Sequence, residues 1–247
     1  MSDYILGRNP VMEALKSGRQ IHKVLVAKGA GKGSIVEIIS RAKKARVPVQ
    51  EVERNALDNM TGGQNHQGVV ALVPAMEYVD VEDILEAARQ KGDPPFILVL
   101  DEIEDPHNLG AILRTADAVG VHGVIIPKHR ATGLTGTVSK ASSGAVEYVP
   151  VARVVNLART LEMLKKEGLW VVGADIDGEV IWQSKGLSGA LACVIGGESR
   201  GISRLIKEKC DYIVSIPMKG QVNSLNASVA AAVLCYEILR QKEKVNI

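Results

Sequence analysis

The strongest constraint on the fold is an alternation of short apolar runs with helical segments in the second part of the chain. The runs are four or five residues long, and turns separate them from the helical segments. Because a strand that is apolar along its whole length must be covered on both faces, the pattern predicts an α/β fold with a parallel sheet between helices. The expected strands are Phe96 to Leu100, Gly123 to Ile126, Trp170 to Ala174, Leu191 to Ile195 and Tyr212 to Ile216, and an Ala-rich helix, Ala227 to Lys242, closes the chain. Ligands of such sheets bind beyond the C-terminal ends of the strands.

The first part of the chain also alternates expected helices and strands, over a shorter stretch of sequence. We expect a helix at Pro10 to Lys16 and a second at Ile35 to Ala45, with Ser34 as its N-cap. Strands are expected at His22 to Ala27, Val47 to Val52 and Gly68 to Val73. Residues 1–74 would therefore form a small α/β domain.

An acidic segment follows, residues 75–93, with one helical pattern at Val81 to Lys91. It runs into the helix-breaking sequence Gly92-Asp93-Pro94-Pro95. We assign it as the linker to a second domain, residues 94–247.

Positive charge is concentrated near the N-terminus. Nine Lys or Arg residues and one acidic residue, Glu37, lie between Lys16 and Arg46, although the whole chain has a net charge of only +2. Such a block is typical of a face that binds a polyanion, and a solvated helix surface is the alternative. Because aromatic residues make up only 3% of the chain, phosphate contacts and shape would dominate any RNA binding.

Composition also argues against several classes of protein. Cys193, Cys210 and Cys235 are odd in number and far apart, so neither a disulfide framework nor a zinc site is indicated. The first ten residues lack the apolar core of a signal peptide, and no apolar run is long enough for a membrane span. We therefore expect a cytoplasmic protein with no metal and no membrane partner.

One glycine-rich segment imitates a phosphate loop. Residues 29–34 (GAGKGS) follow an expected strand and precede an expected helix. The Ser or Thr that should follow Lys32 is missing, and Ser34 occupies the position of the third Gly in the dinucleotide-binding motif. The segment is better interpreted as a basic turn.

A first candidate motif follows the strand at Phe96 to Leu100. Asn108 is expected just before a helix whose buried stripe includes Ile112 and Ala116. Arg114 lies off that stripe, so packing does not require it. An Asn cap and a surface Arg are the structural alternative.

Two further motifs lie near the C-terminus. In the second, Val194 to Ser203 (VIGGESRGIS), glycines would let backbone amides approach a ligand closely. Its Glu198 favours a ligand with hydroxyls or positive charge over a phosphate. The third runs from Ser215 through Ile216 and Met218 to Ala230, where two Asn and two Ser within six residues exceed the needs of one helix cap. Redundant capping is the alternative.

Together these motifs resemble the signatures of the SPOUT class of RNA methyltransferases, in the branch that methylates ribose 2′-hydroxyls of tRNA and rRNA. The N-terminal stretch Leu6 to Leu15, with residues 65–69 (NHQGV), resembles the substrate-binding domain of bacterial 23S rRNA guanosine-2′-O-methyltransferases. The matching residues are Asn108, Gly110 and Arg114 in the first motif, Gly196, Glu198 and Gly201 in the second, and Pro217, Met218, Ser224, Leu225, Asn226 and Ser228 in the third.

The resemblance implies a ribosomal-protein-like RNA-binding domain followed by a catalytic domain with a trefoil knot, a rare exception among folds. It implies a homodimer with active sites at the subunit interface, S-adenosylmethionine as methyl donor, no metal, and a guanosine of large-subunit (23S) rRNA as substrate. By the same resemblance Asn108, Arg114, Glu198, Ser224 and Asn226 would be catalytic, and Gly196, Gly201, Ile216, Met218 and Leu225 would bind the donor.

Transfer to a ribose hydroxyl requires removal of one proton. The family proposal gives this task to Arg114, but a guanidinium is a very weak acid. Holding the adjacent phosphate and stabilising the developing alkoxide is a milder role, and the sequence leaves both open.

Three other functions remain as alternatives. One is 2′-O-methylation of tRNA, which the sequence does not separate from that of rRNA. Another is a non-catalytic RNA-binding or ribosome-assembly factor, against which the intact Arg114, Glu198 and Ser224 argue. The third is a nucleotide-dependent oxidoreductase, against which the missing dinucleotide-binding motif argues.

Overall fold

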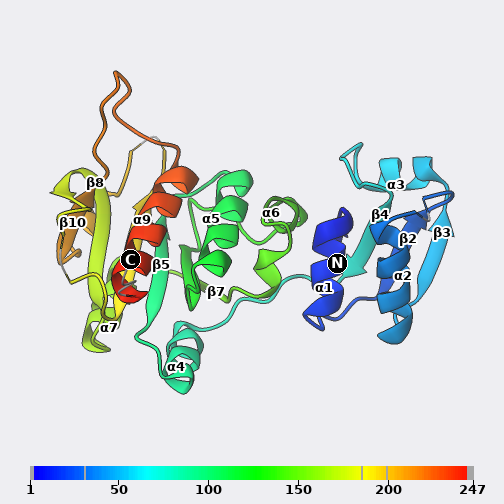
Figure 1. Ribbon diagram of the computed structural model, residues 1–247, viewed down its shortest axis with the longest axis horizontal. Helices are drawn as coiled ribbons and strands as arrows, with labels where there is room; N and C mark the ends of the chain where they lie inside the picture. Colours follow the sequence, from blue (N-terminus) through cyan, green and yellow to red (C-terminus); the bar gives the residue numbers. More distant parts are fainter. Residues whose placement is uncertain (1–2, 31, 185, 199, 244–247) are drawn as a thin grey trace. The chain divides into compact units, whose positions relative to one another are not determined.

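The computed structural model describes residues 3–30, 32–184, 186–198 and 200–243, and these form two compact units (Figure 1). The first unit comprises the described residues up to Glu77 together with Gly133–Tyr148. The second comprises Tyr78–Thr132 and the described residues from Val149 onward.

This division differs from the expected boundaries in two respects. The helix α4 (Val81–Lys91), expected within a linker, packs into the core of the second unit through Val81, Ile84 and Leu85. Residues 133–148 join the first unit, where α6 (Gly136–Ala141) contacts the first strand. Sequence periodicity could not reveal this contact, because it joins segments more than one hundred positions apart.

The first unit is built on a four-stranded sheet with the order β1-β4-β2-β3. β4 is antiparallel to both β1 and β2, and β2 is parallel to β3. Apolar residues of α1 and α2 cover one face of this sheet. The elements are β1 (Asp3–Leu6), α1 (Arg8–Lys16), β2 (Lys23–Ala27), α2 (Ser34–Lys44), β3 (Val49–Val52), α3 (Arg54–Met60), β4 (Val69–Val73), α6 and the 3₁₀ turn η1 (Ala145–Glu147).

The expected elements of this unit are present, but two details differ. Ser34 is not the N-cap of α2: it is the first helical residue, and Gly33 occupies the cap position with φ 66°. A glycine adopts this left-handed conformation without the steric cost that a Ser would incur. The strand β1 and the helix α3 were not expected, since both are short and carry no clear periodicity.

The second unit contains a six-stranded parallel sheet with the order β10-β8-β9-β5-β6-β7. All five expected strands are confirmed, and the edge strand β7 is additional. The strands are β5 (Phe96–Asp101), β6 (Gly123–Pro127), β7 (Val151–Val154), β8 (Trp170–Val180), β9 (Leu191–Gly196) and β10 (Tyr212–Ser215).

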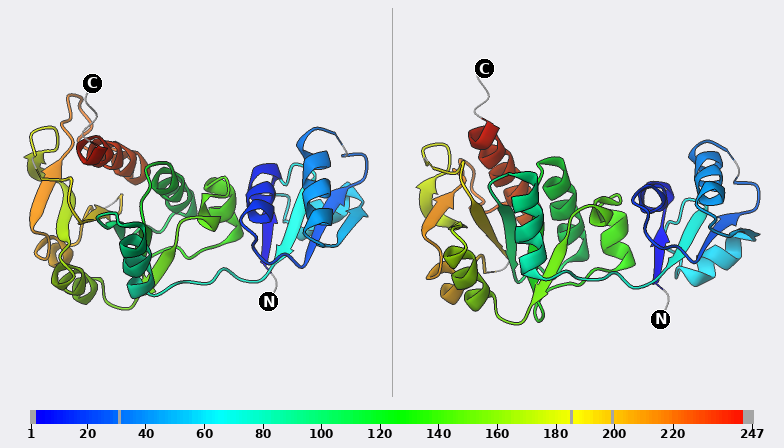
Figure 2. Two further views of the ribbon diagram at one scale, coloured as in Figure 1. Left: turned by 60° about the horizontal axis from the view of Figure 1, so that its bottom comes forward. Right: turned by 90° about the horizontal axis from the view of Figure 1, so that it is seen from below.

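Helices cover both faces of this sheet, as the apolar strands require. The helices α4, α7 (Leu157–Lys166) and α8 (Arg204–Lys207) pack on one face. On the other face α5 (Pro106–Ala118) packs against the Ala-rich α9 (Ala227–Glu243). In the left view of Figure 2, α5 and α9 lie on the opposite side of the strands from α4 and α7.

Two irregularities mark the C-terminal edge of the sheet. The chain moves from β5 to β6 and β7 in one direction, whereas β9 and β8 lie on the other side of β5. Such a switch in direction opens a crevice between neighbouring loops. In addition, the pairing of β10 with β8 jumps from Ile213↔Gly173 to Val214↔Glu179. The residues of β8 between Gly173 and Glu179 therefore have no partner residue in β10, and we call them the released segment of β8.

Candidate active site

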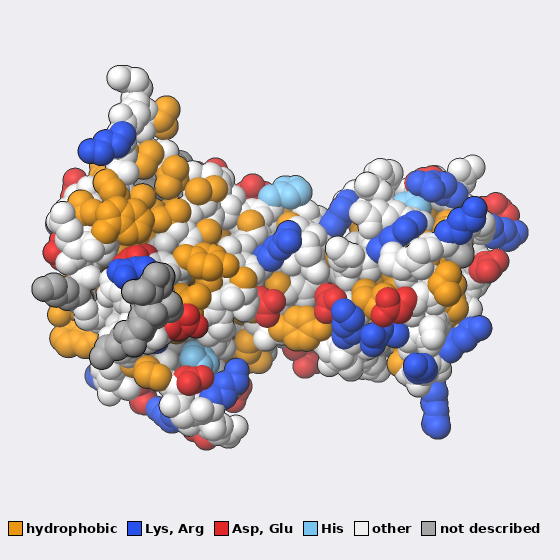
Figure 3. Space-filling model, in the orientation of Figure 1, with side chains coloured by type: hydrophobic (Ala, Val, Ile, Leu, Met, Phe, Trp, Pro, Cys, Tyr) orange, Lys and Arg blue, Asp and Glu red, His pale blue; other side chains and the backbone are white. Residues whose placement is uncertain are grey.

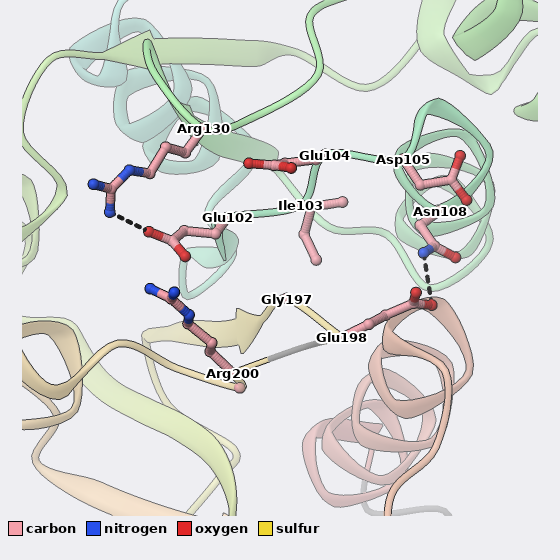
Figure 4. Close-up of a pocket in the computed structure, with 10 residues that line it drawn as sticks. Glu102, Ile103, Glu104, Asp105, Asn108, Arg130, Gly197, Glu198 and Arg200 are labelled. Atoms are coloured by element: carbon pink, nitrogen blue, oxygen red, sulfur yellow. Dashed lines mark hydrogen bonds and ion pairs between the residues drawn. The ribbon is translucent and has the colours of Figure 1, made fainter.

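The three motif segments meet through one hydrogen-bonded cluster above the sheet edge. Asn108 donates from Nδ2 to Oε1 of Glu198 over 2.9 Å. Asn226 donates from Nδ2 to Oδ1 of Asn108 over 2.9 Å and also to Oε1 of Glu198. Each motif therefore contributes one side chain to the cluster, and Figure 4 shows the Asn108–Glu198 bond.

Asn108 lies inside α5 rather than before it, which corrects the sequence expectation. Asp105 is the N-cap, accepting from the backbone N–H of His107, and Pro106 begins the helix. Pro suits this position because the first helical N–H has no intrahelical partner. Asn108 is thus in the first turn with only 6% of its surface exposed, so its orientation is fixed by Glu198 and Asn226 rather than by a capping role.

Asn226 links the cluster to α9. Its Oδ1 accepts from the backbone N–H and the hydroxyl of Ser228, at 3.0 and 2.6 Å, while its Nδ2 faces the other two motifs. Asn226 therefore does cap the helix, as the structural alternative held, whereas Ser228 only donates to it. The same amide, however, also serves the cluster, so capping alone does not account for Asn226.

The loop after β9 needs glycine because the chain folds back on itself. A Cβ atom on Gly196 would lie 2.0 Å from the carbonyl carbon of Gly201, and one on Gly197 would lie 2.5 Å from the oxygen of Glu102. Gly201 has φ 63° and donates its N–H to the oxygen of Gly197 over 2.9 Å. Any side chain at Gly196 would push this loop apart.

A cavity of about 430 Å³ lies between this loop, the released segment of β8 and the loop before α9. The five residues predicted to bind the donor border it together with Glu198 and Ser224, namely Gly196, Gly201, Ile216, Met218 and Leu225. That these residues bind the donor stays a prediction, but the structure places all five around the same cavity.

Sequence reasoning missed Asp175 and Ile176, which border the same cavity from the released segment of β8. The Asp175 carboxylate accepts a 3.0 Å ion pair from Lys207, which raises the pKa of that lysine. No spacing signal marks Asp175, because its position depends on the break in strand pairing.

A second cavity, of about 570 Å³, adjoins the first, and both are bordered by Gly197, Glu198, Arg200 and Gly201. It opens between the loops that follow β5 and β6 (Figure 4). Its lining carries both signs of charge: Glu102, Glu104, Asp105, Asn108, Arg130 and Arg200 contribute, with Ile103. The Asn108–Glu198 pair therefore lies where the two cavities meet.

Arg114 is placed apart from this cluster. It occupies an exposed position of α5, while Ile112 and Ala116 are buried, as the apolar stripe predicted. Within the described part of the chain, Arg114 borders neither cavity. One chain alone thus brings together all the predicted site residues except Arg114.

Other kinds of site find little support. Among the described residues, no group of three or more His, Cys, Asp or Glu side chains is arranged to hold a metal ion. Burial raises the pKa of Cys235 to about 12 and that of Cys210 to about 11, so neither thiol is activated as a nucleophile. No described helix is long and apolar enough to cross a membrane.

Comparison with known proteins agrees with this geometry. Residues 95–236 match the model of the SpoU rRNA methylase family, and residues 4–79 match the substrate-binding domain of RNA 2′-O ribose methyltransferases. The chain therefore belongs to the SpoU methylase family of RNA 2′-O-methyltransferases.

Individual relatives match over nearly the whole chain. YacO of Bacillus subtilis, described as a TrmH-family tRNA/rRNA methyltransferase, is 53% identical over 98% of this chain and 97% of its own length. A TrmH-family relative from Staphylococcus haemolyticus is 48% identical, over 98% of this chain and 96% of its own.

Solved structures show the same two-part fold. AviRb of Streptomyces viridochromogenes, a SpoU methyltransferase solved with S-adenosylmethionine, aligns with a TM-score of 0.83 and 25% identity over 98% of this chain and 91% of its own. A donor-bound rRNA methyltransferase from Sinorhizobium meliloti aligns with a TM-score of 0.79 and 25% identity over 97% of this chain and 87% of its own.

Proposed function

We propose that this protein transfers a methyl group from S-adenosylmethionine to the ribose 2′-hydroxyl of a guanosine in 23S rRNA. The observation that carries the proposal is the cluster of Asn108, Glu198 and Asn226, which joins the three family motifs at the border between two cavities. A two-substrate reaction needs such a border, because donor and acceptor must meet within bonding distance.

The 430 Å³ cavity suits the donor. Backbone at Gly196 and Gly201 can approach a ligand closely, and Leu225, Ile216 and Met218 supply apolar surface. Asp175 and Glu198 give the cavity acidic groups, which favour a ligand that carries an ammonium and a sulfonium. The donor supplies an already activated methyl group, so the chain has only to position the ribose and manage one proton.

The hydrogen-bonded cluster acts through positioning. Glu198 accepts from both amides and ties the glycine-rich loop to the N-terminal ends of α5 and α9. Asn108 is held by this bonding and faces the second cavity. Ser224 is exposed at the rim of the donor cavity, where its hydroxyl can contact the ribose.

A homodimer would explain two features of the single chain, namely the exposed apolar side chains of α9 and the position of Arg114 outside both cavities. α9 has apolar residues all round: Leu234 and Ile238 are buried, while Val229 and Tyr236 are 47% and 55% exposed. Orange side chains gather over this part of the unit in Figure 3. A second copy seated here would cover this face. It would also bring its own Arg114 toward a cavity that the arginine does not border within its own chain.

The trefoil knot is proposed on the same family resemblance. β10 is an edge strand, yet the helix that follows it contacts β9 and α5 nearer the middle of the unit. The loop 216–226 therefore has to cross back over the sheet, as the threading of a knot requires.

The first unit is proposed to bind the RNA. Within its basic block, Arg19, Lys28 and Arg41 form ion pairs with carboxylates, whereas Lys43, Lys44 and Arg46 lie exposed at the end of α2. The latter group is therefore the better candidate for phosphate contacts. Because the proposed substrate is ribosomal RNA, we also propose a cytoplasmic location.

The decisive experiment is to map ribose methylation. Total RNA from a bacterial strain that lacks the protein is incubated with the full chain and S-adenosylmethionine, and 23S rRNA, 16S rRNA and tRNA are then analysed separately. A new 2′-O-methyl group in 23S rRNA is the expected result. Methylation confined to tRNA would support the alternative that the relatives' description leaves open, and no methylation in any fraction would contradict the proposal.

A further inference from the structure

The 570 Å³ cavity combines carboxylates and guanidinium groups in one recess beside the donor cavity. Glu102, Glu104 and Asp105 enter it from the loop after β5, and Arg130 from the loop after β6. A recess lined by arginines alone would suit phosphate, and one lined by acids alone would repel RNA. The mixture suits a nucleotide whose base offers N–H donors while its backbone carries negative charge.

One ion pair fixes a carboxylate in this recess. Arg130 donates from Nη1 to Oε1 of Glu102 over 2.9 Å, and the pair joins two separate loops. The Glu102 side chain is 25% exposed and that of Arg130 71%, so the carboxylate is the more enclosed partner. Both residues have left-handed backbone, φ 59° and 55°, which is uncommon outside glycine. The loops thus hold this pair in a defined place.

The fixed carboxylate keeps capacity for another ligand. A carboxylate accepts at about four positions on its two oxygens, and the described hydrogen bond with Arg130 uses Oε1. Figure 4 shows the Glu102 carboxylate between the guanidinium groups of Arg130 and Arg200, facing the recess. An oxygen pair oriented in this way can receive two parallel N–H bonds from a planar partner.

Among the four RNA bases, only guanine presents two adjacent donors, N1–H and the N2 amino group. On the pairing edges of adenine and cytosine an amino donor lies beside a ring acceptor, whose lone pair a carboxylate repels. Uracil has one donor between two acceptors. A site built to accept hydrogen bonds strongly disfavours a ligand that lacks the donors, because its own polar atoms are then left unpaired.

We infer that this cavity receives the base of the acceptor nucleotide and that Glu102, held by Arg130, selects guanine by accepting from N1–H and N2. The inference rests on the proposed function, since the ribose of a base seated here lies toward the Asn108–Glu198 border with the donor cavity. Glu102 is then a specificity-determining residue, and it is separate from the predicted catalytic set.

The test measures which nucleoside is methylated. RNA treated as above is digested to nucleosides, and the four 2′-O-methylnucleosides are measured by mass spectrometry against a sample without protein. The wild type is expected to form 2′-O-methylguanosine alone. Glu102→Gln should lower that product by roughly 10- to 100-fold, the scale of one bidentate contact.

A second arm uses the mapped target as two transcripts, with guanosine or adenosine at the modified position. The amide of Glu102→Gln offers one acceptor and one donor, which matches the adenine edge better than the guanine edge. The variant should therefore prefer the adenosine transcript, reversing the wild-type order. Glu208→Gln is the matched control, because Glu208 forms an exposed ion pair with Arg204 outside both cavities. It should behave as wild type.

The outcomes separate this inference from the proposed function. If the wild type forms no 2′-O-methylnucleoside, the proposed function itself fails. If it forms 2′-O-methyladenosine, -cytidine or -uridine, methylation stands and guanine selection is wrong. If Glu102→Gln leaves guanosine methylation unchanged, or lowers kcat/KM equally for both transcripts, Glu102 does not read the base.

Discussion

The amides of Asn226 and Asn108 are joined by a 2.9 Å hydrogen bond although the residues lie 118 positions apart. The Asn226 side chain has two roles, because its oxygen caps α9 while its nitrogen donates to Asn108 and Glu198. Capping requires an oxygen that accepts a hydrogen bond, whereas the cluster requires an N–H group that donates one. The two roles can therefore be separated by substitution.

Asn226→Asp should retain the helix cap and lose the cluster. The carboxylate still accepts from Ser228, but it cannot donate and it adds a negative charge beside Glu198. We expect methyl transfer to fall by about 10²-fold, with little change in thermal stability. Asn226→Ala should lose both roles and cost about 1 kcal/mol of stability as well, the usual loss for an N-cap. Equal activity of Asn226→Asp and wild type would exclude the cluster from the reaction.

Gly196→Ala should strongly weaken donor binding. The added Cβ would lie 2.0 Å from backbone of Gly201, so the loop at the donor cavity must open. We expect at least a 10-fold weaker affinity for S-adenosylmethionine by calorimetry, and a stability loss of about 1–3 kcal/mol, typical of overpacking. Gly189→Ala is the control, because its Cβ meets nothing within 4 Å. A normal donor affinity for Gly196→Ala would argue against this cavity as the donor site.

Reversal of charge at Lys43, Lys44 and Arg46 to Glu tests the proposed RNA face. Loss of these exposed cations should weaken RNA binding and flatten its dependence on salt, because fewer counterions are released. Donor affinity should not change. Reversal of Lys166 and Arg204, exposed on the second unit, provides the comparison. If both sets of variants show the wild-type salt slope, the block on α2 is solvated surface.

Arg19 and Glu147 form a buried ion pair that fastens residues 133–148 to the first unit. Burial raises the pKa of Glu147 despite the arginine. Folding thus favours the protonated carboxyl, and its stabilising contribution is present below the unfolded pKa and lost as pH rises through the folded value. Arg19→Met should cost about 3–5 kcal/mol near pH 7, since it leaves a buried charge unpaired.

The pH dependence of thermal unfolding distinguishes the loss of the Arg19–Glu147 ion pair from a simple packing defect. The loss of stability in Arg19→Met, relative to wild type, should become smaller as pH falls through the range in which Glu147 is protonated. In Arg19→Met combined with Glu147→Gln, that dependence should disappear. A deficit that stays constant with pH would mean that Glu147 carries no charge in the folded protein.

Sequence periodicity predicted the strands of the second unit because each contains a run of mainly apolar residues, and this run is buried without a break in the central strands β5 and β9. It missed β7, where Arg153 is exposed and the strand lies at the sheet edge. The motif residues around the donor cavity were also anticipated, since glycines and clustered Asn and Ser are visible in the sequence. Asp175, Glu102 and Arg130 were not, because a break in strand pairing and two left-handed loop residues place them, and neither leaves a pattern.

Arg114 provides the sharpest test of both mechanism and assembly. It is exposed on α5, so Arg114→Ala should change stability by no more than about 0.5 kcal/mol. Single-turnover methyl transfer should nevertheless fall by about 10²-fold or more. Arg114→Lys should be nearly as poor as Ala if the planar fork of the guanidinium is needed, and near wild type if charge alone suffices. We expect the first of these results.

Mixing two inactive variants then shows which subunit supplies the arginine. If Arg114 acts across the dimer, an Arg114→Ala chain paired with a Gly196→Ala chain contains one site with both defects and one with neither. Random reassortment of equal amounts makes about half of the dimers mixed, so activity should return to about a quarter of wild type. If Arg114 serves the cavity of its own chain, every site in the mixture has one defect and activity stays absent. Light scattering on each variant alone verifies that both still form dimers, without which no reassortment could occur.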